Sequence, residues 1–117
     1  MMRTVDFYRT ADGRCPVREY LDSLEPKDAV KIAFSISIVE ELDVIPSSYF
    51  KHLDDGIYEI RAQRGGNIFR LLGFFFRGSL VILTNGFSKK TQKTPKKEIS
   101  LAKDRRKDFL SRQGGRR

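Results

Sequence analysis

Three strand-like segments joined by two short turns fill much of the second half of the chain, and this pattern constrains the fold more than any other feature. The segments span residues 57–64, 67–76 and 79–88. Gly65-Gly66 separates the first two, as in a tight hairpin turn, and Arg77-Gly78 marks a second turn. The sequence therefore predicts an antiparallel three-stranded meander.

Helical spacing of apolar residues occurs on both sides of the meander. The expected elements outside the meander are a short strand at 4–8, helices at 16–24 and 28–43, and a final helix that reaches about Ser111. Thr94 before Pro95 predicts the cap and the first position of that final helix. We therefore expect an α+β fold with an N-terminal strand, two helices, the three-stranded meander and a C-terminal helix.

The chain has 117 residues, of which 39% are apolar, so it can bury one core. We expect a single domain over residues 1–117, with 112–117 as a frayed tail. Cys15 is the only cysteine and His52 the only histidine, which excludes an intramolecular disulfide and a cysteine-based zinc site. No stretch has the character of a signal peptide or a membrane span. These features predict a cytoplasmic protein with no metal, no other cofactor and no membrane partner.

Positive charge is concentrated at one end of the chain. The formal net charge is +8, but residues 1–88 carry 11 basic and 12 acidic side chains, whereas residues 89–117 carry 12 basic and 3 acidic ones. The first segment therefore has a net charge of −1 and the second a net charge of +9. The basic run 89–97 begins directly at the end of a predicted strand. This placement favours a polyanionic partner, nucleic acid above all, over a merely solvated face.

The first hairpin places two arginines next to each other. If Gly65-Gly66 forms the turn, Arg61 lies directly opposite Arg70 on the neighbouring strand. Like charges in that position destabilise a sheet, within the range of about 0.2–1 kcal/mol for such pairs. We therefore expect an anion between them. Ordinary ion pairs of Arg61 with Glu59 or Asp55 are the alternative explanation.

The second hairpin brings further charged residues to the same face. Depending on its turn, Arg70 lies opposite Asn85 or Phe87, and in either register Arg61, Arg70, Phe87 and Lys89 share one face. We expect this face to be half open and to form a basic pocket. The opposite face is expected to be the core side that the helices cover. Its expected members are Tyr58, Ile60, Ala62, Phe69, Leu71, Phe75, Leu80 and Ile82.

Other motifs carry less weight. No glycine-rich phosphate loop of the Walker or dinucleotide-binding type occurs, so nucleotide hydrolysis is not expected. His52 precedes the Asp54-Asp55-Gly56 turn, and a single loop histidine is more often a surface residue than a catalyst. The carboxylates of Asp54, Asp55 and Glu59 could bind Mg²⁺, but adjacent aspartates before a glycine more often form a turn.

Three stretches in and next to the meander resemble a known family. They are residues 55–61, residues 66–70 and residues 83–95, and the most specific part is the Asn-Gly-Phe-x-Lys-Lys-Thr-x-Lys-Thr-Pro run that begins at Asn85. In these stretches the chain is similar to the HigB-type, phage-derived branch of the RelE/ParE toxin superfamily, and the similarity spans nearly the whole chain. The resemblance implies a RelE-like α+β fold.

The resemblance also implies a function. Such toxins belong to type II toxin–antitoxin pairs and are endoribonucleases that enter the ribosomal A site and cleave the mRNA there. Their partners are the ribosome, the mRNA and a cognate antitoxin, commonly a helix-turn-helix repressor. By position, Glu59, Arg61 and Arg70 fall where the superfamily carries catalytic side chains on the first two meander strands, and residues 87–90 fall on its last catalytic segment. The chain differs from some relatives in having Glu59 in place of lysine, and it has no tyrosine or histidine in that last segment.

Metal-free RNA cleavage indicates what each candidate would do. The 2′-OH attacks its own 3′ phosphate, which needs a base, an acid for the leaving 5′ oxygen, and positive charge on the phosphorane. Arg61 and Arg70 suit the scissile phosphate because a guanidinium binds two phosphate oxygens and stays protonated. Lys89 or Lys90 is a candidate for proton transfer, and Glu59 is the other candidate base.

The remaining candidates would bind RNA. Phe87 offers a ring on which an unstacked base could lie, and a core role for that ring is the alternative. Lys93, Lys96 and Lys97 would bind the RNA backbone without reading sequence. Two other functions are possible on the same scaffold: a ParE-like inhibitor of DNA gyrase, or a nucleic-acid-binding module without catalysis.

Overall fold

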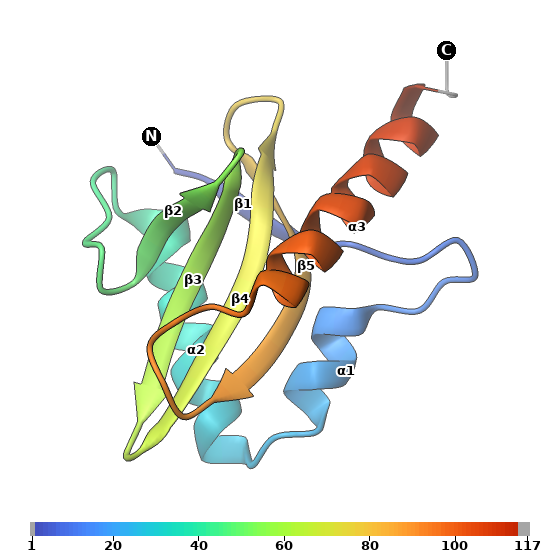
Figure 1. Cartoon of the computed structure of the whole chain (residues 1–117). Coiled ribbons are helices and arrows are strands. Elements are labelled where there is room, and N and C mark those ends of the chain that lie inside the picture. Colours follow the sequence, from blue (N-terminus) through green and yellow to red (C-terminus); the bar gives the residue numbers. More distant parts are fainter. Residues whose placement is uncertain (1, 115–117) are drawn as a thin grey trace.

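The meander is the centre of a larger sheet. The computed structural model describes residues 2–114, and within that range the chain forms a five-stranded mixed sheet and three helices (Figure 1). The elements in chain order are β1 (Thr4–Phe7), α1 (Pro16–Asp22), α2 (Pro26–Glu41), β2 (Phe50–Asp54), β3 (Ile57–Arg64), β4 (Asn67–Phe76), β5 (Leu80–Lys89) and α3 (Lys96–Gly114). The strand order is β1-β5-β4-β3-β2. The α+β class is thus confirmed, but the sheet has five strands where the sequence predicted a meander of three.

The two additional strand pairings explain the difference. β2 pairs antiparallel with β3, although its residues were expected to lie in a loop. Its pattern is weak because it has only five residues, and Lys51 and His52 are both exposed. β1 pairs parallel with β5. No short turn joins those two strands, so their pairing left no local signal in the sequence.

The ends of the helices also differ from the expectation. α2 begins at Pro26, two residues earlier than expected, because a proline is tolerated in the first turn. α3 extends through Gly114, so residues 112–114 are helical and not part of a frayed tail. The last three residues of that expected tail, 115–117, lie outside the described residues. Within residues 2–114 no helix is long and apolar enough to span a bilayer.

A β-bulge in β5 exchanges the faces of its residues. Leu72 pairs with Asn85 but Gly73 pairs with Leu83, so Thr84 is an extra residue in the ladder. Because side chains alternate along a strand, one extra residue reverses the face of everything on its far side. The expectation that Leu80 and Ile82 share a face with Ile60 and Leu71 is therefore wrong. Between the bulge and Lys89 the expected alternation holds, and Phe87 is the residue opposite Arg70.

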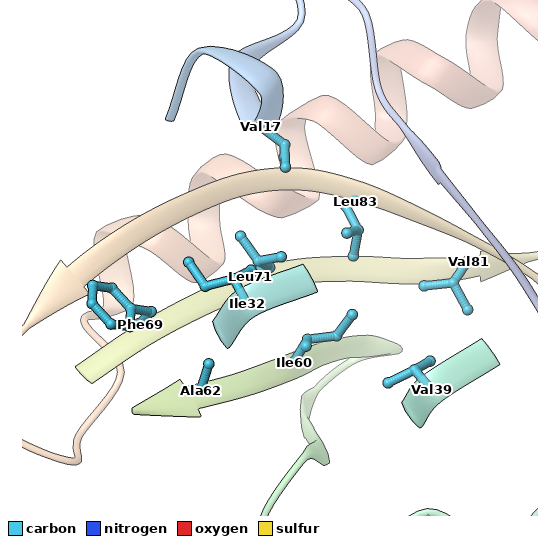
Figure 2. Packing of buried hydrophobic residues seen from close by; sticks show 9 residues of the cluster. All are labelled: Val17, Ile32, Val39, Ile60, Ala62, Phe69, Leu71, Val81 and Leu83. Carbon is cyan, nitrogen blue, oxygen red and sulfur yellow. The ribbon is translucent and has the colours of Figure 1, made fainter. Parts of the chain in front are cut away.

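Helices cover both faces of the sheet. In Figure 1, α2 lies behind the sheet and α1 is drawn beside β5, and both pack on a first apolar cluster. α3 crosses in front of the sheet and packs on a second cluster. The first cluster, drawn in Figure 2, consists of Val17, Ile32, Val39, Ile60, Ala62, Phe69, Leu71, Val81 and Leu83. The second consists of Tyr8, Ile57, Leu72, Phe74, Ile82 and Ala102. The face expected to be half open is thus covered by α3 along part of its length. The charged residues lie beyond that cover.

The bulge leads to a prediction about Gly73. A β-carbon at this position would collide with the backbone carbonyl oxygen of Ile82 and lie 2.9 Å from Leu83 Cδ2. Gly73→Ala should therefore lower the free energy of unfolding by about 1–3 kcal/mol, measured by urea denaturation. Gly66→Ala is the control, because nothing lies within 4 Å of the added carbon, and it should change stability by less than about 0.5 kcal/mol. Equal losses for the two variants would contradict the described ladder.

Candidate functional site

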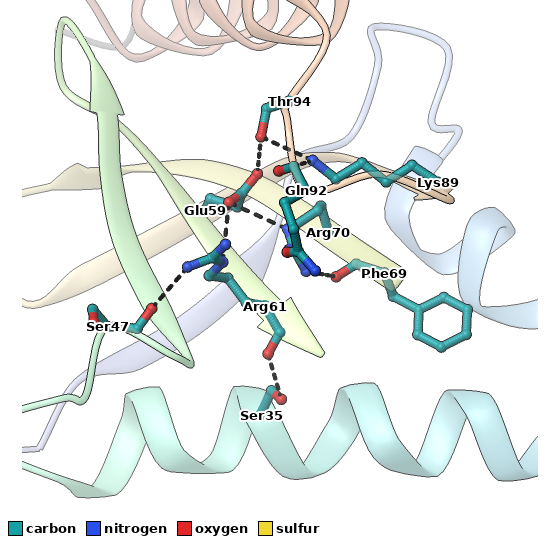
Figure 3. Close-up of polar contacts among 9 residues, drawn as sticks. All are labelled: Ser35, Ser47, Glu59, Arg61, Phe69, Arg70, Lys89, Gln92 and Thr94. Carbon is teal, nitrogen blue, oxygen red and sulfur yellow. Dashed lines mark hydrogen bonds and ion pairs between the residues drawn. The ribbon is translucent and has the colours of Figure 1, made fainter. Parts of the chain in front are cut away.

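A single carboxylate lies between the two facing arginines. Arg61 and Arg70 are cross-strand partners, as the hairpin predicted. Glu59 is on the same face of β3, and its Oε1 atom is 3.4 Å from Arg61 Nε and 3.3 Å from Arg70 Nε (Figure 3). The anion between the arginines is therefore Glu59 of the chain itself, which corresponds to the ion-pair alternative. Asp55, the other expected partner of Arg61, instead pairs with Arg106.

The Glu59–Arg70 pair is buried. Glu59 is 1% exposed and Arg70 is 2% exposed, and a buried charge is costly unless it is paired and hydrogen-bonded. Arg70 donates from Nη1 to the carbonyl oxygen of Phe69 at 3.0 Å and from Nη2 to Gln92 Oε1 at 2.8 Å. Burial lowers the pKa of Arg70, Glu59 opposes that effect, and the charge of Arg61 adds to it. The fold thus holds a charged group in its interior with several fixed partners.

Arg61 has a more open position. Its side chain is 22% exposed, and its Nη1 atom donates to the carbonyl oxygen of Ser47 at 3.2 Å. Its own backbone carbonyl accepts a bond from Ser35 Oγ on α2 at 2.8 Å. The backbone is fixed between two elements while part of the guanidinium remains accessible to a ligand.

The segment between β5 and α3 closes over the carboxylate. The Thr94 hydroxyl donates to Glu59 Oε2, and Lys89 Nζ donates to Thr94 Oγ1 at 3.4 Å and to the carbonyl oxygen of Gln92 at 2.6 Å (Figure 3). Thr94 was expected to cap α3. Instead the carbonyl oxygen of Pro95 accepts the first bonds of that helix, from the amides of Glu98 and Ile99. Thr94 thereby connects Lys89 to Glu59.

Positive charge exceeds negative charge in this group. We call Glu59, Arg61, Arg70 and Lys89 the charged cluster; it holds three cations and one carboxylate. The pKa of Lys89 is lowered, first by burial and then by the charges of Arg70 and Arg61, while Glu59 raises it. The cluster therefore has a surplus of two positive charges and a lysine that releases its proton more easily than usual.

The bulge anchors α3 beside the cluster. Thr84 Oγ1 donates to Asn85 Oδ1 at 2.6 Å, and Asn85 Nδ2 donates to Glu98 Oε1 at 2.9 Å. Glu98 lies in the first turn of α3. Asn85 is buried, and its amide therefore fixes the position at which the basic segment leaves the sheet.

A pocket opens next to the cluster. It lies along the part of β3, from Arg61 onward, that extends past its pairing with β2. Its volume is about 380 Å³. Arg61, Arg70 and Gln92 contribute to its lining, as do the aromatic residues Phe34 and Tyr49. Within residues 2–114, no three His, Cys, Asp or Glu side chains are grouped so that they could hold a metal ion.

The structure separates the sequence candidates. Glu59, Arg61, Arg70 and Lys89 come together, whereas the ammonium of Lys90 donates to Asn67 Oδ1 at 2.7 Å, outside the cluster. The ring of Phe87 packs against the second apolar cluster, which corresponds to the core alternative for that residue. The three RNA-binding candidates, Lys93, Lys96 and Lys97, are exposed.

His52 lies on β2, not in a loop. Its ring contacts Tyr58 edge-on at 5.0 Å between centroids, and its Nε2 atom accepts a bond from the Gly56 amide. The sequence did not identify two residues that contact the cluster, Gln92 and Thr94, as members of the site. Their only sequence signal was their place within the specific run that follows Asn85.

Comparison with known proteins adds a family. A family model described as phage derived protein Gp49-like (DUF891) matches residues 19–107. The matched span includes α2, all strands from β2 to β5, and the whole charged cluster. No curated protein matches the chain.

The charges around Lys89 predict how its pKa responds to substitution. Glu59→Gln removes the charge that raises the pKa of Lys89, so the pKa should fall further; Arg61→Gln removes a charge that lowers it, so the pKa should rise. The measurement is an NMR pH titration of the Lys89 side chain. Lys107→Gln, at an exposed position of α3, is the control and should leave the titration unchanged. Shifts in the opposite directions would refute the described electrostatics.

Proposed function

Because the chain belongs to the Gp49-like family of phage-derived proteins, a toxin-type family of the RelE/HigB kind, we propose that it is the toxin of a type II toxin–antitoxin pair. We assign it to the HigB-type branch, on the run that begins at Asn85, and to the cytoplasm. Its activity is ribosome-dependent cleavage of mRNA, and a cognate antitoxin neutralises it. The observation that carries the activity is the charged cluster, in which three cations surround one carboxylate at the side of an open pocket.

The surplus charge suits the scissile phosphate. Attack by the 2′ oxygen turns a phosphate with one negative charge into a phosphorane with two, and fixed positive charge stabilises this change. Of the two arginines, Arg61 is the more accessible, and it meets the phosphate from the pocket. Arg70 lies below it, held by Phe69 and Gln92, and needs no reorganisation when the charge develops. Their side-by-side placement fits two oxygens of one phosphate.

The Lys89–Thr94–Glu59 chain supplies the proton transfers. As the phosphate oxygens pair with the guanidiniums of Arg61 and Arg70, the Glu59 carboxylate is released from its ion pairs and accepts the proton of the 2′-OH. The bond from the 2′ oxygen to phosphorus forms, and the bond to the 5′ oxygen breaks. Lys89, with its lowered pKa, donates a proton to that leaving oxygen. The products are a 2′,3′-cyclic phosphate and a 5′-hydroxyl end.

The exposed lysines near the cluster support binding to the ribosome. Lys93 precedes α3, and Lys96 and Lys97 form its first turn, next to the point where Thr94 contacts Glu59. Phosphate contacts by such side chains are independent of sequence and weaken as salt displaces them. This role matches a toxin that recognises ribosomal RNA while the pocket receives the mRNA.

Adjacent lysines offer a matched test of the assignment. Lys89→Gln should reduce the rate of mRNA cleavage on ribosomes by about 10²–10⁴-fold, as expected for loss of a general acid. Lys90→Gln makes the same substitution at the neighbouring lysine, which contacts Asn67 outside the cluster. This variant should retain cleavage within a few-fold. Primer extension on ribosome-bound mRNA measures both. Equal activity of the two variants would exclude the proposed role of Lys89.

The ends of the products test the reaction itself. The upstream fragment should carry a 2′,3′-cyclic phosphate or its opened form, and the downstream fragment a 5′-hydroxyl that is ready for kinase labelling. Mass spectrometry of a short cleaved mRNA identifies both ends. A 3′-hydroxyl on the upstream fragment would rule out the 2′-OH mechanism. Growth arrest with intact mRNA and inhibited DNA supercoiling would instead support the gyrase alternative.

A further inference from the structure

Two aromatic rings face the pocket beside the charged cluster. Phe34 comes from α2, and Tyr49 lies in the loop that leads into β2. Their ring centroids are 6.1 Å apart with an interplanar angle of 62°. The two rings therefore form a single aromatic wall, built from segments that are far apart in the sequence.

The loop that carries Tyr49 is fixed to the same strand as Arg61. The Tyr49 carbonyl oxygen accepts a bond from the Arg61 amide at 2.8 Å, and the guanidinium of Arg61 donates to Ser47 in the same loop. The distance between the aromatic wall and the guanidinium is thus set by the edge of the sheet. The side chain of Gln63, two residues further along β3, adds an exposed amide to the pocket lining.

Core packing does not account for the aromatic wall. Phe34 is 50% exposed and belongs to neither apolar cluster. A single exposed phenylalanine needs no explanation, but this one borders a pocket of about 380 Å³ that also holds Arg61, Arg70 and the amides of Gln63 and Gln92. Small-molecule sites have this composition, with an apolar wall, a few fixed polar groups, and volumes of about 300–1,000 Å³.

We propose that the pocket binds the nucleotide next to the scissile phosphate, with its phosphate on Arg61 and Arg70 and its base against Tyr49 and Phe34. This subsite rests on the proposed function and adds to it the residues that hold the base. Aromatic rings accept any base by stacking, while the amides of Gln63 and Gln92 offer donors and acceptors to its edge. Phe87, the ring that the sequence suggested for this role, packs instead against the second apolar cluster.

A second hollow lies next to the pocket and provides a control. It is a wider groove of about 740 Å³ between α2 and the end of β3, and it shares Lys31, Phe34 and Gln63 with the pocket. Val30 lines this groove but not the pocket, and it is 69% exposed. A ligand of the groove, such as a protein segment, would depend on Val30, whereas a base in the pocket would not.

The test is binding of an RNA trinucleotide that contains 2-aminopurine and 2′-O-methyl groups, which prevent cleavage. Its fluorescence should be quenched when the base stacks on the aromatic wall of the full-length protein. Tyr49→Leu and Phe34→Leu should each weaken binding by roughly tenfold, and Arg61→Gln should weaken it as well. Val30→Ala should bind like the unchanged protein. Inorganic phosphate should compete with the trinucleotide, because it occupies the arginines alone.

Each contrary result bears on one claim. Equal binding by Tyr49→Leu, Phe34→Leu and the unchanged chain would overturn the subsite, as would a lack of quenching at the highest protein concentration reached. An equal loss in Val30→Ala and Phe34→Leu would place the ligand in the groove and also overturn it. If binding depends on both rings while the unchanged chain does not cleave mRNA on ribosomes, the subsite stands and the proposed nuclease function fails. If the unchanged chain cleaves mRNA but the rings do not affect binding, the function stands and the subsite fails.

Discussion

The Glu59 carboxylate is the charge on which the site depends. It lies in the interior, bound by Arg61, Arg70 and Thr94, and without it Arg70 would be a buried cation with no counterion, a change that costs about 3–5 kcal/mol in comparable pairs. Its Oε1 atom contacts the two arginines of the first hairpin, and its Oε2 atom accepts a bond from Thr94, in the segment that leads into α3. The same group thus stabilises a hairpin with two facing arginines, contacts the segment before α3, and holds the two guanidiniums side by side.

The bulge at Thr84 determines where that group can lie. By reversing the faces of β5, it directs Val81 and Leu83 toward α1 and α2, and Ile82 toward α3. Both faces of the sheet thereby become apolar at the bulged end, where α3 covers one of them. The charged cluster lies past the end of this cover, and the bond from Asn85 to Glu98 fixes the start of α3 at the boundary. The extra residue, Thr84, therefore lies between an apolar part of β5, which packs in the core, and the part of β5 that carries the charged site.

Local signals in the sequence predicted part of this arrangement. The Gly65-Gly66 turn fixed the pairing of Arg61 with Arg70, and strand alternation placed Lys89 on the same face. The sequence also predicts Glu59 as an ion-pair partner of Arg61 or as a base. The bulge could not be predicted, because residues 80–83 of β5 are all apolar, and apolar side chains would be buried whichever of them face each side of the sheet. The roles of Gln92, Thr94, Phe34 and Tyr49 depend on how a loop and a helix meet the edge of β3, and that contact left no periodic pattern.

The proposed reaction requires that one phosphate engages both Arg61 and Arg70 and takes them over from Glu59. NMR resonances of the two arginine Nε–H groups report this directly, since each lies within 3.4 Å of the same carboxylate oxygen. When a 2′-O-methyl RNA dinucleotide is added, the resonances of Arg61 and Arg70 should shift together and follow one dissociation constant. If the dinucleotide binds while both resonances stay unchanged, the phosphate lies elsewhere and the claim is wrong.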